Sequence, residues 1–355
     1  LIHRSSLLLI MTGENSVRIA LLLFCFIAHV PFSVAHHSVT VFFDRATMVE
    51  VEGIVTDIFW KNPHVVLTLA VVGEDGTTQN WELEGGTTNT LVRRGFAANS
   101  VSIGDRIRAA GAGSRRGEPA IFISNVLLPN GVEVITSDRE ATFRWKTEID
   151  STGNGYAEND LSGHGIFKVW GYRELYQLRN PLILTPAARI ARAAFNPRTD
   201  DPGLRCIPPG MPNAVLNPYP MEFLEEDGRI IQRIEEWDAR RIIHMIEGEV
   251  IQNYEPDHLG YSVGRFEANT LVVETTQVDF PLLDGDGVPM SSNAKILERY
   301  TLSEDETHLS YEVIVEDPQN LVEPAIWENV WIYRSGVTVM PFECSLRDIV
   351  GPVYR

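Results

Sequence analysis

Apolar and polar side chains alternate through Leu309-Ser310-Tyr311-Glu312-Val313-Ile314-Val315-Glu316. Every odd-numbered position in this segment is apolar, and all but one of the even-numbered positions are polar. Successive side chains of a β-strand point to opposite faces, so this period of two predicts a half-buried strand. The segment therefore indicates a β fold for the second half of the chain.

The same kind of segment recurs along the second half, separated by short turns. Asp227-Gly228 and Glu267-Ala268-Asn269 have lengths suited to hairpins. Thr185-Pro186 is a cap followed by a proline, which predicts one short helix over 187–195. About eight consecutive antiparallel strands predict an up-and-down barrel resembling lipocalins, which would enclose one small ligand; an open sandwich is the alternative. The predicted strands cover 221–225, 229–237, 241–246, 260–267, 270–278, 294–302, 308–316 and 326–334.

The first half has shorter strand segments and one short helix. β-branched and apolar runs predict strands over 49–55, 65–69, 78–83, 106–109 and 120–127. Residues 90–95 predict a helix that ends at Gly95, where a left-handed cap needs no Cβ. Three strands, a helix and two strands is the order of a small OB-like barrel. The sequence therefore predicts a mainly all-β protein with two different barrels.

Apolar periodicity fails between the two halves. The segments Ser151-Thr152-Gly153-Asn154-Gly155 and Glu158-Asn159-Asp160 are rich in small and polar residues, which is typical of a linker. A chain of 355 residues, 44% of them apolar, is long enough for two cores. We therefore divide the chain into an OB-like domain at 36–136, a linker at 137–164 and an antiparallel barrel domain at 165–355.

Within the first 35 residues, a few upstream residues (1–10) are followed by a segment with the order of a secretory signal peptide. Met11 starts a polar stretch, an unbroken apolar run covers 19–27, and Ser33-Val34-Ala35 forms a small-residue cleavage site. The apolar run is shorter than the roughly 20 residues that a spanning helix needs. We expect cleavage near Ala35 and a periplasmic or secreted protein without stable membrane insertion.

Cysteine usage agrees with export. Cys25 falls within the predicted signal peptide, which leaves Cys206 and Cys344 as a pair in an oxidising compartment. We expect a disulfide between them. A thiolate metal site or a nucleophile is the alternative, and neither cysteine has a C-x-x-C neighbour to support it.

Net charge excludes one class of partner. The formal charge of -18 at pH 7 would repel a polyanion, and nucleic-acid affinity depends on neutralising phosphates. We therefore expect no nucleic-acid partner and no attraction to an anionic membrane surface.

Several motifs resemble those of exported proteins. The first half contains Ala35-His36-His37-Ser38, Trp60-x-Asn62-Pro63-His64 and Trp81-x-x-Glu84-Gly85-Gly86. Over residues 35–135 it resembles a family of small exported bacterial proteins of unknown function. The second half contains Asn217-Pro218-Tyr219-Pro220 and Gly260-Tyr261-Ser262-Val263-Gly264-Arg265, and over 165–350 it resembles a second uncharacterised exported bacterial module. The first resemblance implies a periplasmic barrel domain, and neither implies a known reaction.

A closed second barrel would bring aromatic and ionisable residues into one mostly apolar pocket, the usual form of a small-molecule site. For each candidate a structural role is the alternative. The tryptophans are often core residues, Arg241 can pair with Glu235 or Glu236, and His244 can be a satisfied core histidine. The predicted ligand-binding residues are Trp237, Arg241, His244, Tyr261, Arg265 and Trp331.

Such a barrel suits two functions. The first is a periplasmic protein that binds a small hydrophobic molecule. The alternative is an acid-base enzyme of isomerase, lyase or hydrolase type acting on a hydrophobic substrate, with His244, Tyr261 or Glu236 as candidate catalytic residues. The sequence contains no H-E-x-x-H zinc helix and no phosphate-binding glycine loop.

Cleavage after Ala35 would make His36 the first residue of the mature chain. Its α-amino nitrogen and imidazole could then chelate one ion together, with His37 or His64 supplying a further nitrogen. Nitrogen-rich sites of this kind suit Cu(II). We therefore predict a copper site at the mature N-terminus; the alternative is that His36 and His37 serve only signal processing.

Overall fold

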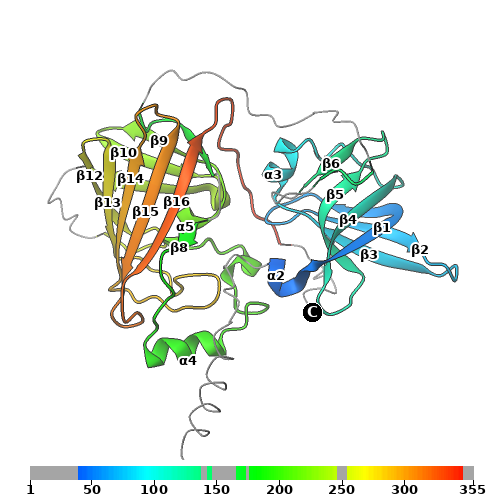
Figure 1. Ribbon diagram of the computed structural model, residues 1–355, viewed down its shortest axis with the longest axis horizontal. Helices are drawn as coiled ribbons and strands as arrows, with labels where there is room; N and C mark the ends of the chain where they lie inside the picture. The colour runs from blue at the N-terminus through cyan, green and yellow to red at the C-terminus, as the bar shows by residue number, and fades with distance from the viewer. Residues whose placement is uncertain (1–38, 137–141, 146–164, 173–175, 246–253, 347–355) are drawn as a thin grey trace, which may run out of the picture. The chain divides into compact units, whose positions relative to one another are not determined.

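The structure is a computed structural model that describes residues 39–136, 142–145, 165–172, 176–245 and 254–346 (Figure 1). The predicted signal peptide, His36, His37 and nearly all of the predicted linker lie outside these residues. No helix within the described ranges is long and apolar enough to span a membrane. The described chain is mainly β, as predicted, and forms one six-stranded and one ten-stranded sheet.

The six-stranded sheet, called the first barrel below, closes on itself. Its elements are α2 (Val39–Phe42), β1 (Phe43–Phe59), β2 (Val66–Val72), β3 (Thr78–Glu84), α3 (Thr88–Arg93), β4 (Arg106–Ser114), β5 (Ala120–Leu127) and β6 (Glu133–Ile135). The strand order β3-β2-β1-β4-β5 becomes a ring through a parallel pairing of β3 with β5. With α3 between β3 and β4, this is the connectivity of the predicted OB-like barrel.

Local sequence explains where α3 begins and ends. The Thr87 hydroxyl accepts a hydrogen bond from the Thr90 main-chain nitrogen at 3.1 Å, which caps the first turn. Gly95 has a φ of 84°, the left-handed conformation that ends the helix as predicted. Leu91 is fully buried in the core of the first barrel. This burial fixes the orientation of α3 and therefore of its polar residues.

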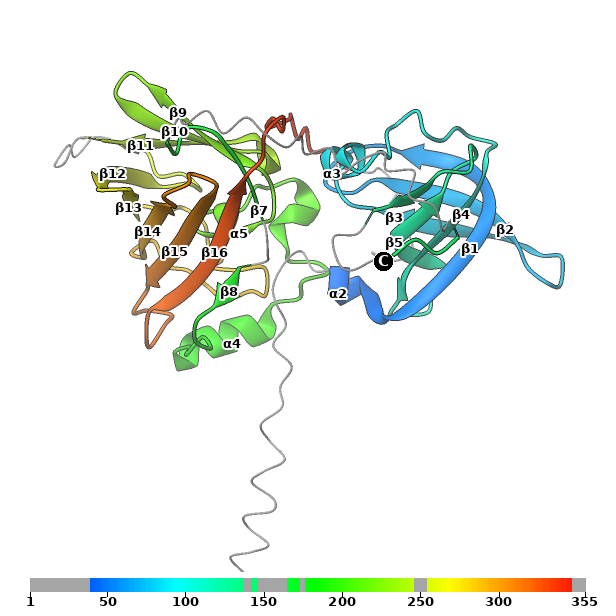
Figure 2. The same ribbon diagram turned by 45° about the horizontal axis from the view of Figure 1, so that its top comes forward.

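The ten-stranded sheet, called the second barrel below, contains a closed ring that is seen in Figure 2. Its strands are β7 (Val169–Tyr172), β8 (Gln177–Leu178), β9 (Met221–Glu226), β10 (Arg229–Ile234), β11 (Ala239–His244), β12 (Tyr261–Glu267), β13 (Thr270–Thr276), β14 (Lys295–Leu302), β15 (His308–Glu316) and β16 (Ala325–Tyr333). The order β15-β14-β13-β12-β11-β10-β9-β7-β16 closes because β16 pairs again with β15. All strands except β8 belong to this ring of nine. β8 pairs with the same edge of β16 as β7 does, at different residues of β16.

One pair of neighbours in the ring is parallel, which corrects the predicted up-and-down order. β11 and β12 run in the same direction, with Ile243 opposite Ser262 and His244 opposite Val263. Eight strands rather than nine are predicted because β7 has only four residues and carries little signal in the sequence. Alternating directions close only around an even number of strands, so a ring of nine requires one parallel pair.

The alternating segment that indicates the β class forms β15 as expected. Its odd-numbered residues, Leu309, Tyr311, Val313 and Val315, are buried in the core of the second barrel. Strand ends agree less well with the sequence interpretation. β10 ends at Ile234 because η2 (Glu236–Asp238), a 3-10 turn, follows it, so the predicted strand through residue 237 is wrong at its end.

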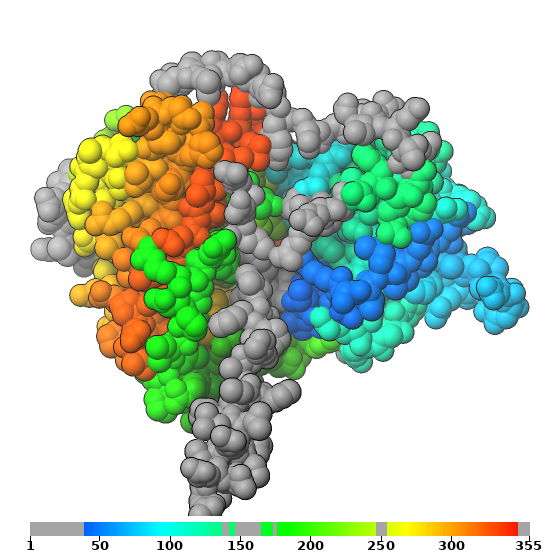
Figure 3. Space-filling view, viewed as in Figure 1, coloured from blue at the N-terminus to red at the C-terminus, as the bar shows by residue number. Residues whose placement is uncertain are grey.

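Short helices connect β8 to β9. They are α4 (Pro186–Ala194), η1 (Pro202–Arg205) and α5 (Asn213–Leu216). The Thr185 hydroxyl caps α4 by accepting from the Ala188 nitrogen at 3.3 Å, as its sequence predicts. α4 lies on the surface (Figure 3), and Ile190 on it is 73% exposed. Ala214, Val215 and Leu216 of α5, in contrast, are buried in the core of the second barrel.

Cys206 and Cys344 form the predicted disulfide. Cys206 directly follows η1, and Cys344 lies in residues 335–346, which we call the tail. The two cysteines are 138 residues apart in sequence, so the bond ties the tail to the segment that leads into α5.

We expect reduction of this disulfide, or the double change Cys206→Ser/Cys344→Ser, to lower the free energy of unfolding by about 2 to 4 kcal/mol, because the bond restricts the unfolded chain. A thiol assay on the unfolded, unreduced chain starting at His36 should find no reactive thiol. Thermal unfolding with and without a dithiol measures the loss. Two reactive thiols, or an unchanged melting temperature, would contradict the bond.

Candidate functional site

Buried polar side chains meet inside the second barrel. Arg241 on β11 donates to Glu298 on β14 at 3.1 Å, and neither side chain has exposed surface. Arg241 also donates to the Ser262 hydroxyl at 2.8 Å and to the Gln232 side-chain oxygen at 3.0 Å. We call the whole set the barrel cluster: Gln232, Arg241, Ser262, Thr275, Glu298, Tyr300 and Tyr311.

Two tyrosines complete the surroundings of Glu298. The hydroxyls of Tyr300 and Tyr311 donate to Glu298 Oε1 at 2.7 and 3.0 Å. Burial raises the pKa of both tyrosines well above its ordinary value of 10, so both hydroxyls remain donors. Arg241 therefore balances the charge of the carboxylate, and the tyrosines bond to its oxygen.

Strand register explains why these residues meet. Gln232 lies opposite Arg241 in the β10–β11 pair, and Ser262 lies opposite Thr275 in the β12–β13 pair. At alternate positions on the same strands, apolar residues such as Ile243 are buried in the barrel core. The alternation that directs the core residues inward therefore directs the cluster inward as well.

Arg241 is a predicted ligand-binding residue that the structure places in the barrel interior. Its partner is Glu298, so the alternative pairing with Glu235 or Glu236 is wrong. Glu298 is not among the residues predicted from the sequence. Its signal is nevertheless present, because Glu298 stands at the inward-facing position between Ile296 and Tyr300 of an alternating strand.

Ser262 belongs to a Gly260-x-Ser262-x-Gly264 segment, which has the spacing of a hydrolase nucleophile elbow. That elbow requires a sharp turn from a strand to a helix, where the serine hydroxyl is exposed. Ser262 instead lies within β12 and is fully buried, and its hydroxyl accepts from Arg241 and contacts Thr275 at 3.0 Å. The segment therefore does not provide a hydrolase nucleophile.

Trp331 is the second predicted residue in the interior, and its donor is unsatisfied. The residue is 1% exposed and lies opposite Leu309 and Tyr172 in its strand pairs. Its indole Nε1 has no hydrogen-bond partner among the described residues. A buried N–H without an acceptor costs about 1 to 3 kcal/mol, so this position favours an acceptor that the described chain does not supply.

Three predicted residues lie on the other face of the barrel wall. The rings of His244 and Tyr261 stack with their centroids 4.9 Å apart. Tyr261 directly precedes Ser262 of the barrel cluster, so strand alternation directs the two side chains to opposite faces. Arg265 donates to Glu267 and Glu274 at 2.9 Å each on the exposed surface. The structure therefore separates these residues from Arg241 and Trp331.

Trp237 and Glu236 lie in η2, outside the strands. The ring centroid of Trp237 is 5.2 Å from that of Phe342 in the tail. Burial raises the pKa of Glu236 to about 8; the charge of Asp201 acts in the same direction, and hydrogen bonds from Asn217 and Trp237 oppose it. Glu236 can therefore hold or release a proton near neutral pH.

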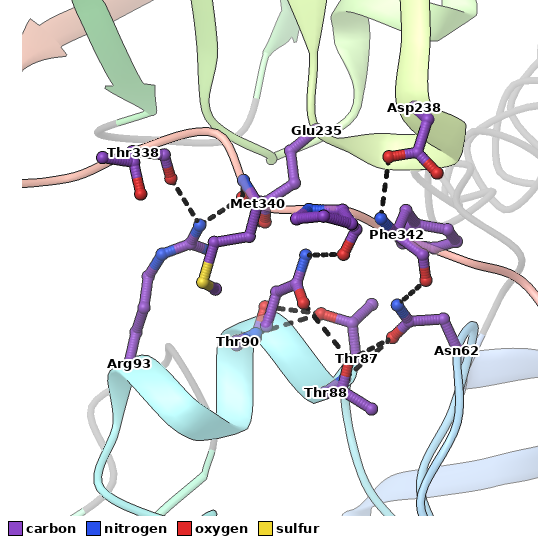
Figure 4. Close-up of polar contacts among 12 residues, drawn as sticks. Asn62, Thr87, Thr88, Thr90, Arg93, Glu235, Asp238, Thr338, Met340 and Phe342 are labelled. Carbon is purple, nitrogen blue, oxygen red and sulfur yellow. Dashed lines mark hydrogen bonds and ion pairs between the residues drawn. The ribbon is translucent and has the colours of Figure 1, made fainter.

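The tail is held through its main chain, and Figure 4 shows the contacts at Thr338, Met340 and Phe342. On one side, residues of the first barrel donate to its carbonyl oxygens. Arg93 donates to Thr338 at 3.2 Å, Asn89 donates to Pro341 at 3.1 Å, and Asn62 donates to Phe342. The Ser345 nitrogen donates back to the Asn62 carbonyl at 2.9 Å.

On the other side, acidic residues that follow β10 accept from the N–H groups of the tail (Figure 4). Glu235 accepts from Met340 at 3.0 Å. Asp238 accepts from Phe342 at 2.8 Å and from Glu343 at 3.1 Å. Arg93 and Glu235 also pair directly at 2.7 Å. We call these five residues the tail slot: Asn62, Asn89, Arg93, Glu235 and Asp238.

The predicted copper site falls mostly outside the described residues, because His36 and His37 are not among them. His64 is described, and its Nδ1 lies 3.0 Å from the Gly85 carbonyl oxygen and 3.3 Å from Glu84 Oε1. The described residues contain no group of three or more histidine, cysteine, aspartate or glutamate side chains that could hold a metal. The copper site stays a prediction from the sequence.

Comparison with known proteins gives a family match for the first half and matches to solved structures. Residues 26–121 match a Family of unknown function (DUF6152), in agreement with the predicted resemblance of the first half. The crystal structure of a secretary abundant heat soluble (SAHS) protein from Ramazzottius varieornatus aligns with a TM-score of 0.26 and 10% identity, over 49% of this chain and 99% of that chain. No curated protein matches the sequence significantly. The second barrel is therefore assigned from its own strand pairing, and the predicted resemblance of residues 165–350 to a second module stays a prediction.

We expect Arg241→Met to lower the free energy of unfolding by about 3 to 5 kcal/mol, because it leaves Glu298 charged and buried without its partner. The double variant Arg241→Met/Glu298→Leu should recover most of the loss, since it removes both charges. Urea unfolding of the wild type, both single variants and the double variant measures the coupling. Strictly additive losses would contradict a buried ion pair.

Glu236 should make stability depend on pH. Between its ordinary pKa of 4.5 and its folded-state pKa of about 8, the folded chain keeps a proton that the unfolded chain releases. Stability from this group therefore falls as pH rises through that window. Glu236→Gln stays neutral and should remove the fall, whereas Glu323→Gln, at an exposed position, should keep it. Denaturant unfolding at a series of pH values is the measurement, and parallel curves for all three proteins would refute the assignment.

Proposed function

We propose that the second barrel binds a small, mostly hydrophobic molecule, and that the protein does so in the periplasm or after secretion. The observation that carries the proposal is the barrel cluster. Seven polar side chains on six strands, β10 to β15, converge in an otherwise apolar interior. A mostly apolar enclosure with a few converging polar groups is the usual composition of a small-molecule site.

The energetic cost of the cluster supports a role beyond stability. Replacing a buried ion pair with apolar residues of similar volume is often neutral or stabilising. The Arg241–Glu298 pair is therefore not needed to fill the interior of this barrel. Its fixed donors and acceptors can instead orient the polar end of a bound molecule.

Charge balance and the indole of Trp331 narrow the kind of molecule. Arg241 is already neutralised by Glu298, so an anionic ligand would gain no new partner from it. Trp331 offers one N–H donor without a partner among the described residues. Both features favour a neutral ligand that carries a hydrogen-bond acceptor, such as a ketone.

The disulfide supports the proposed compartment. Structural disulfides form and persist in oxidising compartments, and Cys206–Cys344 is such a bond. It agrees with the signal peptide that the sequence predicts upstream of His36.

An acid-base enzyme is the second candidate, and Glu236 is the observation that favours it. A carboxyl group with a pKa of about 8 is suited to donate or accept a proton near neutral pH. His244 and Tyr261 form a separate stacked pair on the outer face of the barrel wall. An enzymatic role would therefore rest on Glu236 with Asn217, which donates to it.

Paired probes test the binding proposal. The wild type should bind 2-acetylnaphthalene several-fold more tightly than 2-ethylnaphthalene, because only the ketone accepts a hydrogen bond from Trp331. Trp331→Phe should remove this preference, about a five- to tenfold change for a hydrogen bond of roughly 1 to 1.5 kcal/mol. Trp327→Phe, a similar change on the same strand, should keep it. Calorimetric titration is the measurement.

The possible failures are distinct. If the wild type binds neither naphthalene, nor retains a molecule in native mass spectrometry of material from its own compartment, the binding proposal is wrong. If both probes bind but Trp331→Phe keeps the preference for the ketone, the role of Trp331 is wrong and the barrel remains a binding site.

A further inference from the structure

The tail slot divides its donors and acceptors between two parts of the chain. Asn62, Asn89 and Arg93 of the first barrel bond to carbonyl oxygens of the tail. Glu235 and Asp238, which follow β10, bond to its N–H groups. The tail is therefore held along both of its main-chain edges by side chains of the slot.

Recognition of the tail is almost independent of its side chains. Among the described residues, each hydrogen bond from a slot side chain to the tail ends on a main-chain atom. Phe342 is the exception in packing, since it is 1% exposed and its ring contacts Trp237 and Tyr219 at centroid distances of 5.2 and 6.0 Å. An extended segment with an aromatic residue at this position would make the same contacts.

Contacts within the first barrel orient Asn62 of the slot independently of the tail. The Asn62 side-chain oxygen accepts from the Thr88 nitrogen at 2.8 Å and from the Thr88 hydroxyl at 3.0 Å. This leaves the amide nitrogen of Asn62 directed at the Phe342 carbonyl. Preorganised groups of this kind bind with less loss of side-chain entropy than mobile ones.

An empty slot would be unstable. Asn62, Asn89 and Glu235 are at most 6% exposed, and each bonds to a tail main-chain atom. These side chains are buried with the tail in place, so removal of the tail would exchange its hydrogen bonds for bonds to water. Removal would also expose the ring faces of Trp237 and Tyr219 that contact Phe342, and exposing apolar surface to water is unfavourable. No hydrophobic core cluster of the described residues joins the two barrels to compensate. The vacated slot therefore favours uptake of another extended chain.

We propose that the tail slot is a binding site for an extended polypeptide segment of another molecule, and that the chain's own tail occupies it as an intramolecular inhibitor. The segment presents both main-chain edges and an aromatic side chain at the place of Phe342. The three donors of the slot lie within residues 26–121, the part that matches the family of unknown function, whereas the tail lies outside that part.

The disulfide locks the inhibitor in place. Cys344 lies two residues beyond Phe342, and its bond to Cys206 holds the end of the tail next to the slot. A tethered segment is present at high effective concentration, so it excludes a free peptide. Reduction by a dithiol converts the bond to two thiols while the dithiol becomes a disulfide, and it releases this end of the tail.

A labelled peptide tests the proposal. The probe is a fluorescent synthetic peptide of residues 336–346 with serine at position 344. The open variant is the full chain with Cys206→Ser, Cys344→Ser and Phe342→Ala, which weakens its own tail. Fluorescence anisotropy should show at least tenfold tighter binding to the open variant than to the oxidised wild type. The dithiol-treated wild type should fall between them.

Matched changes establish where the probe binds. Asn89→Ala in the open variant should weaken binding at least fivefold, and so should methylation of the peptide nitrogen at Phe342, which removes its bond to Asp238. A peptide with the other side chains scrambled and Phe342 kept in place should bind within about threefold, because the slot bonds to main chain. Asn130→Ala, in a turn of the first barrel where the Asn130 side chain accepts from the Val132 nitrogen, should have no effect.

Three results would overturn the proposal. One is an open variant that unfolds cooperatively, and is therefore folded, but does not bind the probe. Another is equal binding to the oxidised wild type, which would place the probe elsewhere. The last is unchanged binding after Asn89→Ala. None of these results depends on whether the second barrel binds a small molecule.

Discussion

Closure of nine strands into one ring makes two neighbours in the second barrel run parallel, and the interior depends on that pair. β11 and β12 are these neighbours, so Arg241 on one lies within hydrogen-bond reach of Ser262 on the other. Ser262 in turn contacts Thr275 across the next, antiparallel pair. The guanidinium is thereby surrounded by acceptors from both sides of the parallel junction, and Glu298 balances its charge. A closed ring keeps water from this pair, which makes the geometry of every partner matter.

The β class and both barrels could be predicted from the sequence because each depends on local signals. Alternation through β15, the cap at Thr185 and the glycine that ends α3 all act within a few residues. The disulfide could be predicted for a different reason, since only two cysteines remain once the predicted signal peptide is set aside. The number of strands in the ring could not be predicted, because β7 has four residues and its partners, β9 and β16, lie far along the chain.

The candidate site was predictable only in part. Arg241 and Trp331 point into the barrel, whereas His244, Tyr261 and Arg265 belong to the other face, because residues of one strand alternate between faces and the composition of a strand does not reveal its inner face. Trp237 was assigned to a strand, but β10 ends before it and η2 turns it toward Phe342. Asn62 of the tail slot belongs to the motif Trp60-x-Asn62-Pro63-His64, but the slot as a set could not be predicted, since its members come from distant segments and recognise main-chain atoms that every residue has.

The segment from β10 to η2 contains residues of both candidate sites, so the contacts of the tail affect a strand of the second barrel. Gln232 of the barrel cluster and Glu235 of the tail slot are three residues apart, at the end of β10. Trp237 and Asp238, which follow, have φ values of 60° and 54°, a left-handed conformation that costs non-glycine residues roughly 1 to 2 kcal/mol each. The contacts that offset this cost come from the tail, through the two hydrogen bonds to Asp238 and the ring of Phe342 against Trp237. Release of the tail would therefore remove support for this turn, and the change would begin next to the strand that carries Gln232.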